Sequence, residues 1–174
     1  VGTVTVTVTA TDASTNSSTQ NITVTVVDQT APVITAADQT VVLDGTGSGS
    51  LDVSGISAAD ACTASPALSY SQSTFDCTDL GQVTVTITAV DDESNQSTQD
   101  ITVTVVDQTA PVITAADQTV VLDGTTGLGS LDVTGISAAD NCTGTPTITY
   151  SQSSFDCDDL GQITVTITAT DGAA

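Results

Sequence analysis

The side chains of this 174-residue chain that could do chemistry are carboxylates and thiols. It has 21 acidic residues, of which only Glu93 is not an Asp, and four cysteines, but no Lys, Arg or His. A chain without His or Lys has no ordinary general base near neutral pH, no Ser–His or Cys–His nucleophile and no imidazole metal ligand. We therefore expect that the protein is not an enzyme. A hydrolase that works through a carboxylate pair is the remaining catalytic alternative.

The net charge of −21 also restricts the partners. Without Lys or Arg the chain cannot neutralise phosphates, which predicts that it binds no nucleic acid. An anionic bilayer would repel it, and no run of about 18 apolar residues is present, which predicts that it does not insert into a membrane.

An internal repeat organises the chain. The segment VVDQTAPVITAADQTVVLDG occurs at 26–45 and again at 105–124, so that Asp28 recurs as Asp107 at an offset of 79 residues (107 − 28). One inserted residue in the following Gly-rich loop brings the offset to 80 for the cysteines (142 − 62). Near-identical copies of this length are typical of a tandem array in which each copy buries its own core. The predicted domains are 1–27, the C-terminal strands of a preceding repeat; 28–106, a complete repeat; and 107–174, a second repeat that lacks its last strand.

Within each copy the apolar residues alternate with polar ones. In 83–90, Val83, Val85, Ile87 and Ala89 point one way and the intervening Thr residues the other. Shorter β-prone runs begin at Pro32, Thr40, Ser50, Ala67 and Ser73, separated by turn residues, and 56–60 is expected to form a single helical turn. About seven short strands in a period of about 80 residues predict an all-β fold of tandem immunoglobulin-like β-sandwich repeats.

Four short motifs follow one another in the third copy: D-x-T-A-P-V-I at 107–113, D-N-C at 140–142, F-D-C-x-D-L-G at 155–161 and T-V-T-x-T-A-T-D at 164–171. Their order resembles that of the hyalin repeat (HYR) domain of extracellular adhesion proteins. The middle copy departs from it at Ala61, where the later copy has Asn141. The resemblance implies an immunoglobulin-like fold and a role in adhesion at a cell surface, often within very long bacterial proteins.

Each copy contains two cysteines, 15 positions apart, and four cysteines allow three pairings. Equivalent positions in successive copies would lie about one domain length apart, which favours pairing within a copy. We therefore predict one structural disulfide per repeat, Cys62–Cys77 and Cys142–Cys157. Such bonds are typical of proteins outside the reducing cytosol. A thiolate metal site is the alternative, although two thiols do not complete a tetrahedral shell.

Some of the acidic residues are expected to gather where one repeat meets the next. If 83–90 and 101–106 are the last two strands of a seven-stranded sandwich, then the loop between them, the loop that holds Asp60 and the linker at Asp28 converge. Clustered oxygen ligands from separate loops suit Ca²⁺. The alternative is that these residues are only solvated turn residues. The candidate ligands are Asp28, Asp60, Asp91, Asp92, Glu93 and Asn95 at one junction, and Asp107, Asp140, Asn141 and Asp171 at the next.

The most consistent function is a structural stalk or filament of an extracellular adhesin, stiffened by Ca²⁺ between repeats. Its expected partners are neighbouring repeats end to end, with lateral bundling into fibres, and a cell-surface or environmental ligand bound by domains outside this chain. Two alternatives stay open: a glycan- or protein-binding module in each repeat, and a spacer domain of a secreted hydrolase. The chain has few aromatic rings on which a sugar could stack, because it contains only two Tyr, two Phe and no Trp.

Overall fold

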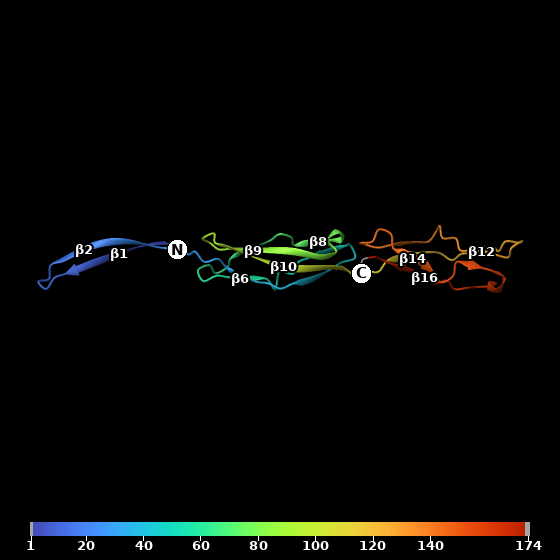
Figure 1. Ribbon diagram of the computed structural model, residues 1–174, viewed down its shortest axis with the longest axis horizontal. Coiled ribbons are helices and arrows are strands. Elements are labelled where there is room, and N and C mark those ends of the chain that lie inside the picture. The colour runs from blue at the N-terminus through green and yellow to red at the C-terminus, as the bar shows by residue number, and fades with distance from the viewer. Residues whose placement is uncertain (1, 173–174) are drawn as a thin grey trace. The chain divides into compact units, whose positions relative to one another are not determined.

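The computed structural model describes residues 2–172 and is all-β, with no α-helix among these residues (Figure 1). Val1, the first residue of the first predicted domain, and 173–174, the last two residues of the last one, lie outside the described residues. The first predicted domain holds β1 (Gly2–Thr11) and β2 (Ser17–Val26). The middle copy holds β3 (Val33–Thr35), β4 (Gln39–Leu43), β5 (Ser48–Ser50), β6 (Ser57–Ala59), β7 (Ala67–Tyr70), β8 (Thr74–Asp76), the 3₁₀-helix η1 (Cys77–Asp79), β9 (Gly81–Val90) and β10 (Gln96–Asp107). The third copy holds β11 (Val112–Thr114), β12 (Gly129–Ser130), β13 (Ser137–Ala139), β14 (Thr147–Tyr150), β15 (Ser154–Phe155), η2 (Cys157–Asp159) and β16 (Ile167–Thr170).

The chain forms two compact units that do not coincide with the sequence repeats. One unit comprises Val1–Ala36, Ser54–Ser71 and Thr86–Asp100, and the other comprises Ala37–Val53, Gln72–Val85 and Ile101–Ala174. Each unit thus takes part of the middle copy, and the domain boundaries drawn from the repeat stay a prediction.

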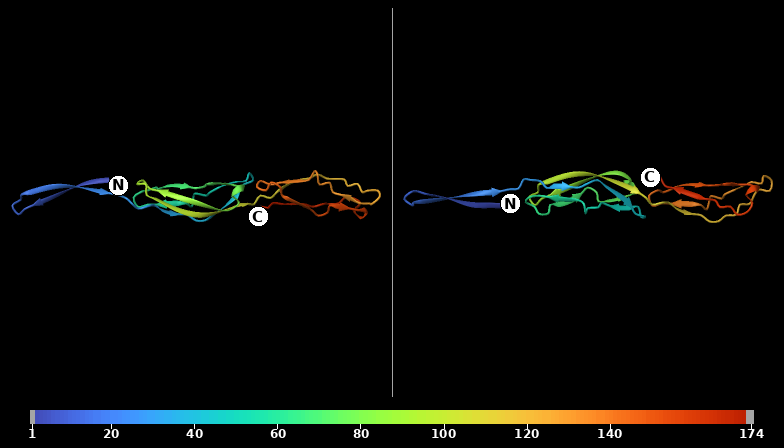
Figure 2. Two further views of the ribbon diagram at one scale, coloured as in Figure 1. Left: turned by 45° about the horizontal axis from the view of Figure 1, so that its top comes forward. Right: turned by 90° about the horizontal axis from the view of Figure 1, so that it is seen from below.

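The largest sheet belongs to the middle copy and has the strand order β4-β10-β9-β7. β7 pairs with β9 in antiparallel fashion, whereas β4 pairs with β10 in parallel, with Val103 opposite Gln39. Two further antiparallel pairs, β3 with β6 and β5 with β8, complete the copy. Figure 2 shows these strands in two further views.

The alternation predicted for the long strands is present in their burial. In β9, Val85, Ile87 and Ala89 are fully buried, and in β10 Val103 and Val105 are buried with them. The intervening Thr side chains are more exposed. The period of two therefore separates an apolar face from a more accessible one, as expected for a pleated strand.

The hairpin of β1 and β2 repeats the sequence of β9 and β10 but has none of its burial. The two strands pair over their whole length and lie side by side in Figures 1 and 2, with Gly2 opposite Val26. Val6 is 41% exposed, whereas its equivalent in the middle copy, Val85, is 0% exposed. Strand pairing and side-chain hydrogen bonds thus hold the hairpin, while the middle copy adds a packed core.

The third copy has fewer strand residues than the middle copy. Residues 118–122, which correspond to β4, are not strand, and β16 begins only at Ile167. In the middle copy these segments lie beside β10.

Two local expectations from the sequence are wrong. Residues 56–60 do not form a helical turn; they contain β6, which pairs with β3 through Ala58 and Ile34. The run expected as a strand from Ser50 instead ends β5 and leads into a turn before Ile56. The helical turns occur elsewhere, at η1 and η2, where Asp76 and Asp156 each form a capping box.

Gly49 lies where two strands approach closely, which gives the first prediction. A Cβ built on Gly49 would collide with Cγ1 of Val41 and lie 3.2 Å from Cδ2 of Leu43, and both side chains are buried. We expect Gly49→Ala to destabilise the protein by about 1–3 kcal/mol, because the stiff Val41 cannot turn away. Urea unfolding followed by circular dichroism measures it.

Gly45→Ala is the matched control, because its Cβ meets nothing within 4 Å. It should change the stability by no more than about 0.5 kcal/mol. Equal urea midpoints for the two variants would show that the close approach at Gly49 is not present in solution.

Candidate functional site

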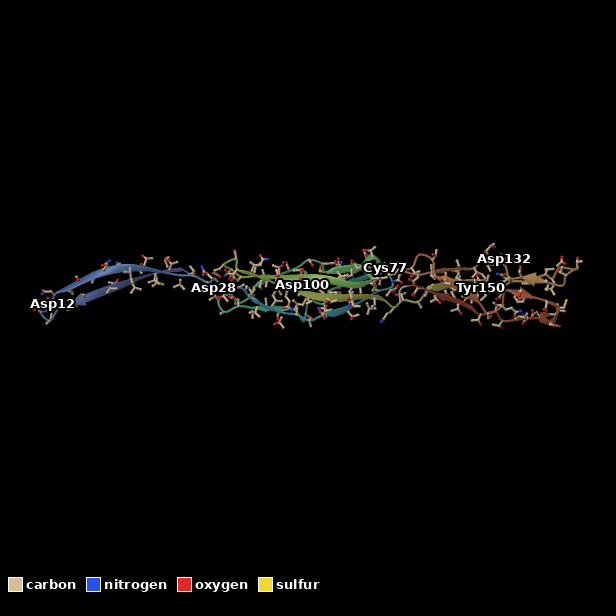
Figure 3. All side chains as sticks on the ribbon, viewed as in Figure 1. Asp12, Asp28, Cys77, Asp100, Asp132 and Tyr150 are labelled. Carbon is tan, nitrogen blue, oxygen red and sulfur yellow. A yellow bond between two sulfur atoms is a disulfide. The ribbon has the colours of Figure 1, made fainter. Side chains whose placement is uncertain are left out.

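Three carboxylates from distant parts of the sequence meet in one cluster. Asp28 follows β2, Asp60 follows β6 and Asp91 follows β9. One carboxylate oxygen of each lies within 4.8 Å of the others. Asp28 is labelled in Figure 3. We call these three residues the acidic cluster.

Short turns hold the first two carboxylates of the acidic cluster. Oδ1 of Asp28 accepts a hydrogen bond from the backbone N–H of Thr30 at 2.9 Å. Oδ1 of Asp60 accepts from the N–H groups of Cys62 and Thr63 at 2.8 Å and 3.0 Å. Asp favours such turns because its short side chain reaches the backbone two residues on.

Asp91 is the most buried member, with an exposed fraction of 6%. Its Oδ1 accepts from the N–H groups of Glu93 and Asn95 at 3.0 Å and 2.7 Å, and its Oδ2 accepts from Nδ2 of Asn95 at 2.7 Å. The same Nδ2 lies 3.3 Å from the carbonyl oxygen of Asp28. Ser94 completes the turn with a φ of 70°. Asn95 therefore ties the β9–β10 turn to the linker that carries Asp28.

The hairpin contains the same turn without the other two carboxylates. Asp12 accepts hydrogen bonds from the backbone and side chain of Asn16, each at 2.9 Å, and Thr15 has a φ of 69°. The side-chain hydrogen bond from Asn16 is the main reason that the pKa of Asp12 lies below its ordinary value. The turn thus forms by itself, and the cluster is added to it by the linker and the β6–β7 loop.

The acidic cluster has the charge and the unpaired oxygen that a cation requires. Oδ2 of Asp28 is buried and has no hydrogen-bond partner. A buried unpaired oxygen on a carboxylate is costly, and so are three negative charges at this distance. Ca²⁺ is bound by six to eight oxygens in a flexible shell, to which carboxylates and backbone carbonyls both contribute. The donor set fits this ion better than Zn²⁺, which prefers nitrogen and sulfur ligands.

Two of the candidate ligands predicted beside Asp91 lie outside the acidic cluster. Asp92 is exposed, and its backbone N–H donates to Oγ1 of Thr63 at 3.2 Å. Glu93 contributes its backbone N–H to Asp91, and its carboxylate is not one of the three that meet. The structure therefore narrows the first predicted set to Asp28, Asp60 and Asp91, with Asn95 as their support.

The second predicted set is only partly assembled. Nδ2 of Asn141 lies 3.4 Å from Oδ1 of Asp107, which also accepts from the N–H of Thr109. Among the described residues Asp107, Asp140 and Asp171 do not meet as closely as the acidic cluster does. Three buried oxygens nevertheless have no hydrogen-bond partner: Oδ2 of Asp107, Oδ2 of Asp140 and Oδ1 of Asn141.

The disulfide pairing predicted from the sequence is wrong. A disulfide is present, but it joins Cys77 to Cys142, which are 65 positions apart, and Cys62 and Cys157 are free and exposed thiols. The bond thus connects the middle copy to the third copy and does not close a loop within either. Comparing only equivalent positions of successive copies missed this pairing, because the second cysteine of one copy bonds the first cysteine of the next.

A turn of the middle copy and one of the third form the surroundings of this bond. Nδ2 of Asn141 donates to the carbonyl oxygen of Asp44 at 2.9 Å. A Cβ on Gly47 would lie 2.6 Å from Sγ of Cys77 and 3.5 Å from Sγ of Cys142, and its φ of 75° also requires glycine. Cys77 itself (Figure 3) begins η1.

Hydrogen bonds from Thr residues hold two turns of the middle copy beside this disulfide, one at Asp44 and one at Asp76. The side chain of Thr46 is the main cause of a pKa of Asp44 below its ordinary value, and Thr78 does the same for Asp76. Asp44, Gly47 and Asp76 were not among the residues predicted for a site. Their sequence signal was a D-G-T-G turn and an F-D-C-T-D cap, which resemble ordinary turns.

Cys62 lies beside the acidic cluster, and the pKa of its thiol is raised there. The negative charge of Asp28 is the main reason that the pKa of Cys62 lies above its ordinary value, and Asp60 contributes in the same direction. A thiol of this kind is less reactive than an ordinary exposed cysteine.

Comparisons with known proteins add no family. A scan against protein-family models finds no match, and a search of curated proteins finds no significantly similar sequence. The resemblance to the hyalin repeat therefore stays a prediction. Among the described residues no helix has the length and apolar character that crossing a bilayer demands.

The two cysteine pairs predict unequal effects on stability. We expect Cys77→Ser with Cys142→Ser to lower the free energy of unfolding by about 4 kcal/mol, the chain-entropy value for a loop of this length. Cys62→Ser with Cys157→Ser removes two exposed free thiols and should change it by less than about 0.5 kcal/mol. Urea unfolding without reductant compares both double variants with the parent. Equal losses would contradict the Cys77–Cys142 pairing.

Proposed function

We propose that this chain is part of the stalk or filament of an extracellular adhesin, in which tandem repeats provide reach and stiffness. The near-identity of the copies carries the proposal, because identical modules suit a spacer better than a set of distinct binding sites. The partners of each repeat are its neighbours, end to end, with lateral bundling as a second contact. Binding of a cell-surface or environmental ligand falls to other domains.

The strand pairing of the middle copy supports an immunoglobulin-like sandwich for the repeat. The order β7-β9-β10 corresponds to strands C, F and G of that fold, and the pairs β3–β6 and β5–β8 correspond to A–B and B–E. On this assignment strand B is divided between β5 and β6 by a bend. Together with the resemblance of the motifs, this topology supports a hyalin-type module.

The chemistry of the side chains supports a structural role. Without His, Lys or Arg, the clusters available are acidic, and one oxygen of each carboxylate in the acidic cluster accepts backbone hydrogen bonds within its own turn. The Cys77–Cys142 disulfide supports a location outside the reducing cytosol. An extracellular stalk accounts for both features, and for the excess of acidic residues as a source of solubility.

Calcium is the second part of the proposal. We infer that Ca²⁺ binds at the acidic cluster and fixes the linker at Asp28 to the loops at Asp60 and Asp91. The buried unpaired Oδ2 of Asp28 supports this most directly, because a cation is the partner it lacks. The equivalent unpaired oxygens of Asp107 and Asp140 support a related site in the next copy.

Calcium should raise the melting temperature of the chain. A ligand at a hundredfold excess over its dissociation constant stabilises by about 2.7 kcal/mol, which corresponds to a shift of several degrees. We expect this shift on adding Ca²⁺ to EDTA-treated protein, a smaller one with Mg²⁺, and none in Asp60→Asn. Differential scanning calorimetry measures the shift in melting temperature, and isothermal titration calorimetry measures the binding of Ca²⁺.

Asp92→Asn is the matched control for the calcium experiment. It removes the same charge from the loop beside the acidic cluster, but its side chain is exposed and lies outside the cluster. It should keep the calcium shift of the parent. If neither the parent nor Asp92→Asn responds to Ca²⁺, the cluster is not a calcium site.

The stalk itself is tested by length. Chains with one, two and three further copies of the repeat should grow in maximum dimension by a constant increment per copy, as measured by small-angle X-ray scattering. Growth with only the cube root of the mass would indicate a compact body and would contradict a stalk. A glycan array with the same chains tests the binding-module alternative, for which a specific signal from an added copy is expected.

A further inference from the structure

The two free cysteines occupy positions whose equivalents are bonded to each other. Cys157 is the third-copy equivalent of Cys77, and Cys62 is the middle-copy equivalent of Cys142. We propose that the Cys77–Cys142 bond is the general connection of the array, so that Cys157 bonds the first cysteine of a following repeat and Cys62 the second cysteine of a preceding one. This inference rests on the proposed repeat array and adds a covalent partner to it, a further copy of the same repeat.

The backbone around Cys157 already has the conformation found around the bonded Cys77, although Cys157 has no disulfide partner. Cys77 and Cys157 each begin a 3₁₀-helix with an Asp capping box. The backbone N–H of Asp76 donates to Oδ2 of Asp79 at 3.0 Å, and that of Asp156 donates to Asp159 at 3.1 Å. The bonded and the free cysteine therefore have the same local backbone, and the partner does not create it.

The glycine beside each of these cysteines is also the same. The carbonyl oxygen of Gly47 lies 3.8 Å from Sγ of Cys77, and that of Gly127 lies 3.9 Å from Sγ of Cys157. Both glycines have a positive φ, 75° and 70°, although the loop of the third copy is one residue longer. A Cβ on Gly127 would lie 3.2 Å from Sγ of Cys157. The insertion is thus absorbed elsewhere in the loop, and the surroundings of the thiol are preserved.

The turn that carries the other cysteine of the bond is also the same in both copies. The backbone N–H of Cys62 donates to Oδ1 of Asp60 at 2.8 Å, and that of Cys142 donates to Oδ1 of Asp140 at 3.0 Å. In each copy the following Thr N–H donates to the same oxygen, at 3.0 Å in both. Cys62 therefore lies in the turn that places Cys142 in its disulfide, and it is exposed to an incoming partner.

Neither free cysteine has its predicted partner within the chain. One period back from Cys77 passes Val1, and one period on from Cys142 passes Ala174. Pairing within a copy is blocked as well, because Cys77 and Cys142 are already bonded to each other. If the second cysteine of each copy bonds the first cysteine of the next, then Cys62 and Cys157 are the two cysteines of this chain without a partner.

The bond forms by ordinary thiol oxidation. The thiol of Cys157 and the partner thiol lose two protons and two electrons, and an S–S bond replaces the two S–H bonds. The electrons go to an exchangeable disulfide oxidant, whose own S–S bond breaks to give two thiols. Each junction would then have two covalent connections, the peptide linker and the disulfide, so that a stretched array cannot separate at the linker alone.

The experiment counts thiols in chains of different length. In the 174-residue chain, purified without reductant, we expect two free thiols, at Cys62 and Cys157. A chain lengthened at its C-terminal end by one period has two more cysteines, and after oxidation with a small-molecule disulfide it should still have two free thiols. Pairing within each copy would leave none in either chain. Four thiols in the longer chain would mean that the new junction has not formed its bond, which would overturn the proposal.

Peptide mapping identifies the bonds. Cleavage before Asp releases 76–78 with Cys77 and 140–155 with Cys142, and we expect these two peptides to be joined until reductant is added. In the longer chain, Cys157→Ser should raise the number of free thiols from two to three, because the partner in the new copy is released. Cys62→Ser is the matched control and should lower it from two to one. Failure of this pattern in a chain that still lengthens by a constant increment would refute the disulfide connection and leave the stalk intact.

Discussion

Every carboxylate in this chain must find its partner without a basic side chain, and this constraint explains much of the local structure. With 21 acidic residues and no Lys, Arg or His, the internal donors are backbone N–H groups and the side chains of Ser, Thr, Asn and Gln. Asp12, Asp44, Asp60 and Asp76 each accept from N–H groups within four residues along the chain. Acidic residues therefore act here as turn-formers first. Some oxygens, such as Oδ2 of Asp28, have no partner after the turns are formed, and for these we propose a cation.

The same turns place the groups that connect successive copies. The turn at Asp60 presents Cys62 beside the acidic cluster, and the equivalent turn at Asp140 presents Cys142 to Cys77. The turn at Asp44 presents Gly47 to that disulfide and a carbonyl oxygen to Asn141. A single device, an Asp that accepts from the backbone two residues on, thus prepares both the candidate cation site and the covalent bond. Local hydrogen bonding fixes the loops, and long-range contacts only have to join loops that already exist.

Much of the fold could be predicted from periodicity, and much of the site from the order of the strands. The alternation in 83–90 gave the buried face of β9, and the assignment of Asp28, Asp60 and Asp91 to loops matches their places after β2, β6 and β9. The expectation for residues 56–60 was wrong because the two Ala residues favour a helical turn, and pairing with β3 overrode that local preference. The disulfide failed for a different reason. Spacing records which cysteines are equivalent, but only the contact of the Asp44–Gly47 turn with Asn141 shows which of them meet.

In the stalk that we propose, the position of the disulfide changes what each repeat contributes. A bond within each copy would strengthen that copy and leave the linker as the weakest point under load. The Cys77–Cys142 bond instead spans the linker at Asp107 and closes a loop that contains the five strands from β9 to β13. Rotation about the linker is then restricted by a second covalent connection, whereas the core of each copy relies on apolar packing of residues such as Val85 and Val103. Calcium at the acidic cluster would act by charge on the preceding linker, at Asp28, so both proposed devices act on linkers and leave the interior of the repeat to the hydrophobic effect.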